Sequence, residues 1–128
     1  MSLTSEDYIQ YRITKSKESL RDAKILADNG SWNACVNRLY YACYYIVSAL
    51  VLQNKINTQT HSGLKAQFNL HFVKTGKLSK EKGKLYSDLM DWRQKGDYGD
   101  MFDFEQDTVE PLLAEVENFI REVELLIS

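Results

Sequence analysis

Apolar side chains recur every three or four residues along most of this chain, which is the spacing of one face of an α-helix. We expect Ser5 to cap a first helix, because a short hydroxyl side chain can accept from the free backbone amides of a helix start. The helix should end at Asn29-Gly30, a typical stop signal. Its apolar stripe consists of Ile9, Ile13, Leu20, Ala23 and Ala27, with Ser16 in the same row. A single stripe indicates that one face packs inward.

The second segment is apolar on almost every side. It covers residues 32 to about 53, with Ser31 in the capping position. A helix of this kind is buried on more than one side, so in a small domain it is the central helix or a subunit interface. Tyr41, Tyr45 and Leu52 cannot all face one small core, and tyrosine is common at interfaces. We therefore expect a homodimer formed through this helix and the end of the fourth one.

Arg38 is the lone charged residue of that apolar segment. A buried guanidinium is costly unless a carboxylate pairs with it. We expect Arg38 to be buried and to form an ion pair with Asp88, Asp91 or Asp97.

Two further helices follow a polar turn. Thr60 is expected to cap a third helix that ends at Thr75-Gly76, and Ser79 to begin a fourth. The side chains expected to be buried are Leu64, Phe68 and Phe72 in the third helix and Leu85, Leu89 and Trp92 in the fourth.

The last segment is an acidic amphipathic helix with its apolar stripe over residues 112–127. Asp107 and Glu110 have the spacing of a capping box, which would place Pro111 near the first turn, where proline is tolerated. If the helix instead starts earlier, near Phe104, Pro111 should kink it. No segment shows the sustained alternation of a strand. The sequence therefore predicts an all-α, up-and-down bundle of about five helices, in one domain covering residues 1–128.

The net charge of −2 hides an uneven distribution. Residues 1–96 contain 15 Lys and Arg against 8 Asp and Glu, whereas residues 97–128 contain 1 against 10. Two interpretations are open. Either the acidic last helix lies beside basic segments and neutralises them, or a basic surface remains free to meet phosphates.

Composition narrows the classes of function. With 44% hydrophobic and 27% charged residues, the chain is expected to be globular. Residues 1–10 lack a signal peptide, and no apolar run is long and clean enough to span a bilayer, so we expect a cytoplasmic protein without membrane contact. Cys35 and Cys43 are eight residues apart on one helix, too far for a disulfide. No metal-ligand cluster, phosphate-binding glycine loop or nucleophile elbow is present, so neither metal nor cofactor is expected.

The segment from residue 91 to 100 concentrates the candidate chemistry where the fourth helix ends. On a helix, Arg93 and Asp97 are one turn apart, with Tyr98 as their neighbour. A guanidinium held by a carboxylate beside a phenol can bind a phosphate or a nucleotide, and Lys95 adds positive charge. The alternative is an ordinary helix C-terminus, where cations complement the helix dipole and a glycine ends the helix.

Four pieces of the chain resemble the HEPN domain in its short stand-alone form, the UPF0332-type family. They are Arg38-Leu39-Tyr40-Tyr41-Ala42-Cys43-Tyr44, Thr60-His61-Ser62-Gly63-Leu64, His71-Phe72-Val73-Lys74-Thr75-Gly76-Lys77-Leu78, and Arg93 with Asp97-Tyr98-Gly99-Asp100. The resemblance covers nearly the whole chain and implies a helical bundle, usually dimeric, with the polar motif at or near the dimer cleft.

The resemblance also implies partners and an activity. Stand-alone members resemble partners of small nucleotidyltransferases, and some act as toxins that cleave RNA without a metal through an Arg-(x four to six)-His motif. Arg93 matches the arginine of that motif, but the histidine positions hold Tyr98, Gly99 and Asp100. A phenol is a poor acid–base group at neutral pH, so no catalytic residue is assigned. His61 and His71 are expected to be surface or core residues rather than ligands.

Three hypotheses remain open. The first is a binding module for a nucleotide or RNA and a cognate nucleotidyltransferase, as part of a toxin–antitoxin-like pair. The second is a metal-independent ribonuclease toxin with an altered motif, and the third is a dimeric scaffold. For the first, the predicted ligand-binding residues are Arg93, Lys95, Asp97 and Tyr98, supported by Arg38, Tyr41 and Asp100.

Overall fold

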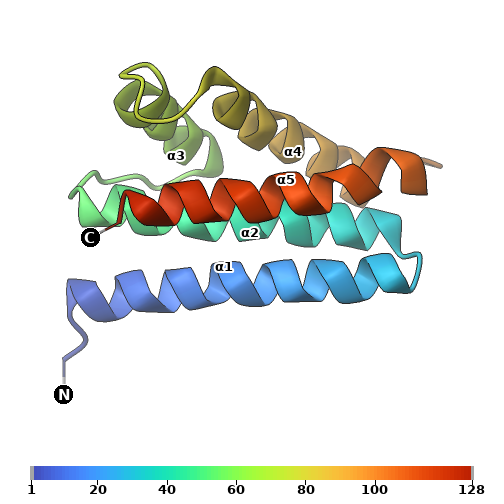
Figure 1. Ribbon diagram of the computed structural model, residues 1–128, viewed down its shortest axis with the longest axis horizontal. Helices are drawn as coiled ribbons and strands as arrows, with labels where there is room; N and C mark the ends of the chain where they lie inside the picture. Colours follow the sequence, from blue (N-terminus) through green and yellow to red (C-terminus); the bar gives the residue numbers. More distant parts are fainter. Residues whose placement is uncertain (1, 128) are drawn as a thin grey trace.

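The computed structural model describes residues 2–127, and within them the chain forms five α-helices and no strand (Figure 1). The helices α1 (Ser5–Asp28), α2 (Trp32–Gln53) and α5 (Gln106–Leu125) lie side by side along the long axis. The helices α3 (His61–Phe68) and α4 (Lys80–Tyr98) lie above them and are joined through a π-helical turn. The predicted all-α fold is therefore confirmed.

The start of α1 differs from the prediction by one residue. Thr4, not Ser5, is the cap: its hydroxyl accepts from the Asp7 amide at 3.2 Å, and the Asp7 carboxylate accepts from the Thr4 amide at 2.8 Å. This reciprocal pair needs an acidic residue three positions after the cap, and only Thr4 has one. At the other end, Gly30 takes a φ of 71°, where a side chain would be strained, and the chain turns into α2.

The central helix is α2, as its all-round apolar character predicts. It packs against α1, α3, α4 and α5, and most of its side chains are buried. By length and composition α2 could cross a membrane, so the prediction that no apolar run is long enough is wrong. Because 67% of the apolar stretch is buried by the other helices, its hydropathy is that of a core helix.

The predicted N-terminal caps of α3 and α4 are confirmed. The Thr60 hydroxyl accepts from the Gly63 amide at 2.9 Å, and the Ser79 hydroxyl from the Lys82 amide at 3.4 Å. The third helical segment is less regular than predicted, because α3 ends at Phe68 and continues as the π-helical turn Asn69–Val73.

The side chains of α4 that are buried differ in part from those that the sequence predicts. Leu89 is buried as predicted, but Leu85 and Trp92 are only partly buried. The residue that fills the core is Tyr86, which is fully buried and stacks on Tyr40 of α2 at 6.1 Å. The predicted side chains of the third segment, Leu64, Phe68 and Phe72, are all buried.

The acidic helix α5 lies beside basic segments, as the first interpretation of the charge asymmetry predicts. Lys17 and Lys24 of α1 pair with Glu124 and Glu117 at 3.0 and 3.3 Å, and Lys82 of α4 pairs with Glu122 at 3.0 Å. The predicted capping box at the start of α5 is wrong, because the helix begins at Gln106 and encloses Pro111.

The chain returns to the end at which it began. The described residues nearest both termini lie at one end of the bundle, whereas α2 begins and α4 ends at the opposite end (Figure 1).

Candidate functional site

The last turns of α4 direct Arg93 and Asp97 toward α2. The Arg93 Nη1 atom lies 3.7 Å from Asp97 Oδ2, and the two side chains are 11% and 25% exposed. The guanidinium carbon of Arg93 lies 5.2 Å from the centroid of the Tyr40 ring and 5.7 Å from that of Tyr41. Its Nε atom is buried without a hydrogen-bond partner among the described residues. Arg93 is thus held by two rings and one loosely placed carboxylate, and keeps unused donors.

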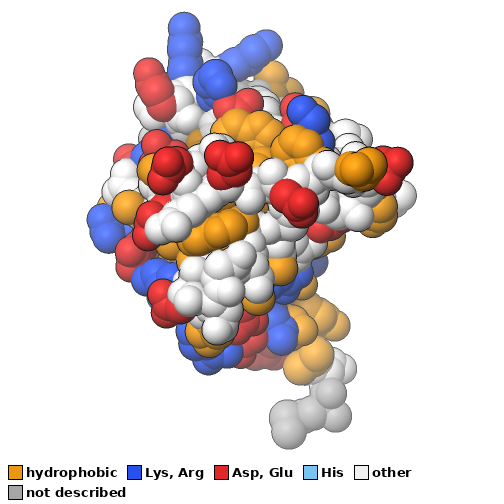
Figure 2. Space-filling model, turned by 90° about the vertical axis from the view of Figure 1, so that its right-hand side faces the viewer, with side chains coloured by type: hydrophobic (Ala, Val, Ile, Leu, Met, Phe, Trp, Pro, Cys, Tyr) orange, Lys and Arg blue, Asp and Glu red, His pale blue; other side chains and the backbone are white. Residues whose placement is uncertain are grey.

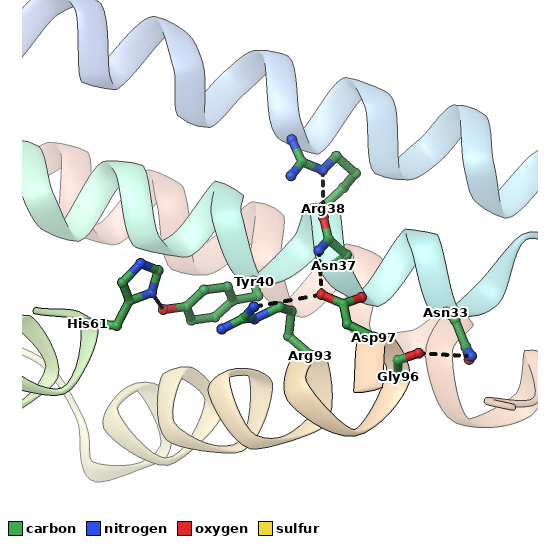
Figure 3. A network of polar contacts seen from close by, with 8 residues as sticks. All are labelled: Asn33, Asn37, Arg38, Tyr40, His61, Arg93, Gly96 and Asp97. Carbon is green, nitrogen blue, oxygen red and sulfur yellow. Dashed lines mark hydrogen bonds and ion pairs between the residues drawn. The ribbon is translucent and has the colours of Figure 1, made fainter. Parts of the chain in front are cut away.

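Arg38 joins this group through an amide rather than a carboxylate. Its Nε donates to the side-chain oxygen of Asn37 at 2.9 Å, and Asn37 Nδ2 donates to Asp97 Oδ2 at 2.9 Å (Figure 3). The guanidinium carbon also lies 5.0 Å from the Tyr41 ring centroid. The predicted direct ion pair with an acid of region 88–97 is therefore wrong. Because Arg38 is half-buried, an amide oxygen and a ring satisfy it without a carboxylate.

The charges of this group do not balance. Two guanidinium groups lie within 6 Å of the Tyr41 ring centroid, and Asp97 is the carboxylate that connects to both. A cluster with one more cation than anion, partly shielded from water, attracts a further negative group. We call Asn37, Arg38, Tyr41, Arg93 and Asp97 the inner cluster.

Lys95 and Tyr98 lie on a different face of the same helix end. Tyr98 is 78% exposed, and Lys95 Nζ lies 5.2 Å from the Phe102 ring centroid. Both line an open hollow of about 610 Å³ whose other lining residues are Asp91, Trp92, Gln94 and Gly99. Asp100 is exposed in the following loop. Acidic side chains surround apolar patches over this end of the molecule (Figure 2). The predicted site is thus divided between the inner cluster and an outer, charge-balanced hollow.

His61 comes close to the inner cluster, which sequence reasoning did not foresee. Its Nδ1 atom lies 2.6 Å from the Tyr40 hydroxyl, and its ring stacks on Tyr44 at 4.6 Å (Figure 3). Burial, and then the positive charge of Arg93, lower the pKa of His61. Burial raises the pKa of the Tyr40 phenol, so Tyr40 keeps its proton and donates to Nδ1. We assign the proton of neutral His61 to Nε2 on this basis.

Asn33 connects the end of α4 with the start of α2 and was also missed. Its Nδ2 atom donates to the carbonyl oxygens of Phe102 and Gly96 at 2.9 and 3.3 Å, and its Oδ1 atom accepts from the Phe104 amide at 2.8 Å. The sequence holds one signal for this contact. A Cβ atom on Gly96 would lie 3.0 Å from Phe104, so a glycine inside a helix marks the close approach.

The site offers binding groups more readily than reactive ones. Burial raises the pKa of the Cys35 thiol to about 11 and raises that of Cys43 as well, so both stay protonated near neutrality. Within residues 2–127, no group of three or more His, Cys, Asp or Glu could hold a metal ion.

A family model described as the HEPN domain matches residues 9–126, which is almost the whole chain. The chain belongs to the HEPN domain family. A UPF0332 protein from Thermotoga maritima is 43% identical over 123 residues, covering 96% of this chain and 93% of the relative. Two proteins from Methanocaldococcus jannaschii that are named as candidate toxins are 30% and 32% identical. Those matches cover 88% and 94% of this chain, and 77% and 84% of the relatives. The resemblance stated from the sequence is confirmed.

Proposed function

We propose that this HEPN protein is a binding module for a nucleotide or RNA and for a cognate small nucleotidyltransferase, as one half of a toxin–antitoxin-like pair. The observation that carries the proposal is the surplus positive charge of the inner cluster. Two guanidinium groups lie beside the Tyr41 ring, and the one carboxylate of the cluster, Asp97, contacts Arg93 directly and Arg38 only through Asn37. The names of the two archaeal relatives support the toxin-like setting.

In this proposal each residue has a defined role. Arg93 and Arg38 bind a phosphate of the ligand, and Asp97 and Asn37 hold the two guanidinium groups in place. Tyr98 is exposed enough to stack on a base outside the cluster, while Lys95 contributes a salt-sensitive attraction.

The protein acts as a homodimer in the same proposal. Tyr41, Tyr45 and Leu52 of α2 are only half-buried by the chain's own helices, so they leave aromatic and apolar surface for a second copy. Light scattering at micromolar protein should give a dimer mass, because interfaces of standard size, about 1,600 Å², keep two copies associated at that concentration. A monomer mass at micromolar protein would contradict this part.

The binding test compares two arginines. Arg93→Ala should weaken binding of a labelled RNA oligonucleotide or of AMP by about tenfold or more, the scale of one charge-assisted contact. Arg21→Ala is the control, because Arg21 is 68% exposed on α1 and lies outside the cluster. Circular dichroism should be recorded for both variants to check that they are folded. Equal binding by Arg93→Ala and wild type, with a loss of stability alone, would favour the scaffold hypothesis.

A ribonuclease toxin is the second candidate, and the names of the archaeal relatives favour it. Metal-independent RNA cleavage by the purified protein, lost in Arg93→Ala, would replace the binding proposal with this one. An adjacent nucleotidyltransferase gene would support either of these two and leave the scaffold hypothesis without an explanation for the pairing.

A further inference from the structure

A second group of unused donors lies away from the inner cluster, where α1 passes the end of α2 and the loop before α3. Two adjoining hollows of about 140 and 80 Å³ meet there and share Arg12, Ser48 and Thr58. The larger hollow is also lined by Tyr44, Gln59, Thr60 and Leu64, and the smaller by Val51, Leu52, Ile56 and Asn57. None of these residues belongs to the inner cluster. The larger hollow has several times the space that one water molecule needs.

Arg12 is the half-buried cation of this hollow, and the described residues give it no counter-ion. Its Nη1 atom donates to the carbonyl oxygen of Ser48 at 3.2 Å. Within residues 2–127, no carboxylate lies at ion-pair distance from it, and no Asp or Glu lines either hollow. Arg93 by comparison has Asp97. The remaining N–H groups of Arg12 are therefore free to donate to a ligand.

The neighbours of Arg12 are also donors without protein partners. Across the described part of the chain, the hydroxyl groups of Tyr44 and Thr58 and the amide of Gln59 make no hydrogen bond with the protein. Thr60, which caps α3, and Leu64 of the first turn of that helix border the same hollow.

We propose that the hollow around Arg12 binds a small oxyanion of the phosphate class, either inorganic phosphate or the phosphate of a nucleotide. The residues that line this cavity supply a guanidinium, two hydroxyl groups and an amide, and none of them is acidic, so the cavity suits an anion that accepts several hydrogen bonds. The site shares no residue with the inner cluster, although Tyr44, which lines the hollow, contacts the Tyr41 ring at 5.7 Å.

The experiment measures thermal stabilisation and affinity for sodium phosphate, with sodium chloride of equal ionic strength as the reference. Phosphate should raise the melting temperature of the wild-type protein by several degrees once it exceeds its Kd about tenfold. Arg12→Gln should lose that shift and weaken binding about tenfold or more. Arg21→Gln, two turns and more further along α1 and exposed, should keep it.

A second variant guards against a loss of folding in Arg12→Gln. Thr58→Val keeps the shape of the side chain but removes one donor, and should weaken phosphate binding several-fold. AMP distinguishes the two sources in an Arg93→Ala background. An Arg12-dependent affinity well above that for phosphate identifies a nucleotide, whereas equal affinity identifies the free ion. A phosphate shift no larger than that of chloride, or one that persists in Arg12→Gln and Thr58→Val, overturns the proposal.

Discussion

The last two turns of α4 carry two faces that differ in what surrounds the charges. Toward α2, Arg93 is 11% exposed and is held against tyrosine rings beside Asp97. Toward solvent, Lys95 and the 78% exposed Tyr98 line an open hollow that also contains Asp91. The residues come from one short stretch of sequence, yet their environments are opposite.

The difference teaches where specific recognition can arise on this HEPN protein. A surface lysine in water gains little from one contact, because solvent and salt screen it. A partly buried guanidinium beside rings and hydrogen bonds is fixed in place before a ligand arrives. The inner face should therefore decide whether a ligand binds, and the outer face how strongly binding depends on salt.

The largest contrast between the faces should come from their tyrosines. Tyr40→Ala should lower the free energy of unfolding by about 3–5 kcal/mol, because it empties a fully buried ring site against Tyr86 and His61. Tyr98→Ala should change it by less than about 0.5 kcal/mol. Urea unfolding followed by circular dichroism measures both, and similar midpoints would show that the two faces do not differ.

A smaller effect is expected from the amide that joins α4 to α2. Asn33→Ala should cost about 2–3 kcal/mol, because the Phe104 amide and the two carbonyl groups lose their partner. Gln94→Ala, on the outer face, should stay within about 0.5 kcal/mol of wild type. Urea unfolding midpoints measure both variants. If Asn33→Ala leaves the free energy of unfolding unchanged, the loop between α4 and α5 is held by packing alone.

The next smaller effect is expected from the cations of the two faces, Arg93 and Lys95. Arg93→Met should cost about 1–2 kcal/mol, since it removes the contacts with the Tyr40 and Tyr41 rings and with Asp97. Lys95→Met should cost less than about 0.5 kcal/mol. In RNA titrations at two salt concentrations, Lys95→Met should mainly reduce the salt dependence, whereas Arg93→Met should reduce affinity at both. Equal losses of RNA affinity in the two variants at both salt concentrations would show that the two faces do not differ in binding.

The smallest expected effect is a pH dependence of stability that arises from His61, beside the inner face. Because its folded environment lowers the pKa of His61 below the ordinary 6.5, protons bind the unfolded chain more readily. The His61 contribution is thus complete above about pH 6.5 and is lost as pH falls through the lower folded pKa. His61→Phe should show a flatter stability profile between pH 7.5 and 5 than wild type. His71→Phe, at an exposed position, is the control for replacing a histidine by a phenylalanine.

The helices were predictable because each rule involved is local. The bounds of α2 and the caps Thr60 and Ser79 follow from spacing and side-chain type within one turn. The errors are local competitions as well: Thr4 replaces Ser5 because Asp7 completes its capping box.

The site was predictable only where its parts are neighbours along one helix. Arg93 and Asp97 are four residues apart, so their contact follows from helical geometry. Asn37, Asn33 and His61 join through the crossing of α2 with α4 and α3, which no short sequence window contains. The prediction for Arg38 failed although its partner Asn37 is the adjacent residue, because it assumed a buried guanidinium that needs a carboxylate, whereas Arg38 is half-buried.

The return of the chain to its starting end has a practical consequence for handling the protein. The described residues nearest the two termini lie at the end of the bundle where α1 begins, and α4 ends at the opposite end (Figure 1). A tag, fluorophore or tether attached at either terminus would leave the opposite end facing the solution. Sensors immobilised through the two termini should consequently report the same affinity for a ligand of the inner cluster, and a fusion partner at either terminus would leave the α2–α4 contact accessible.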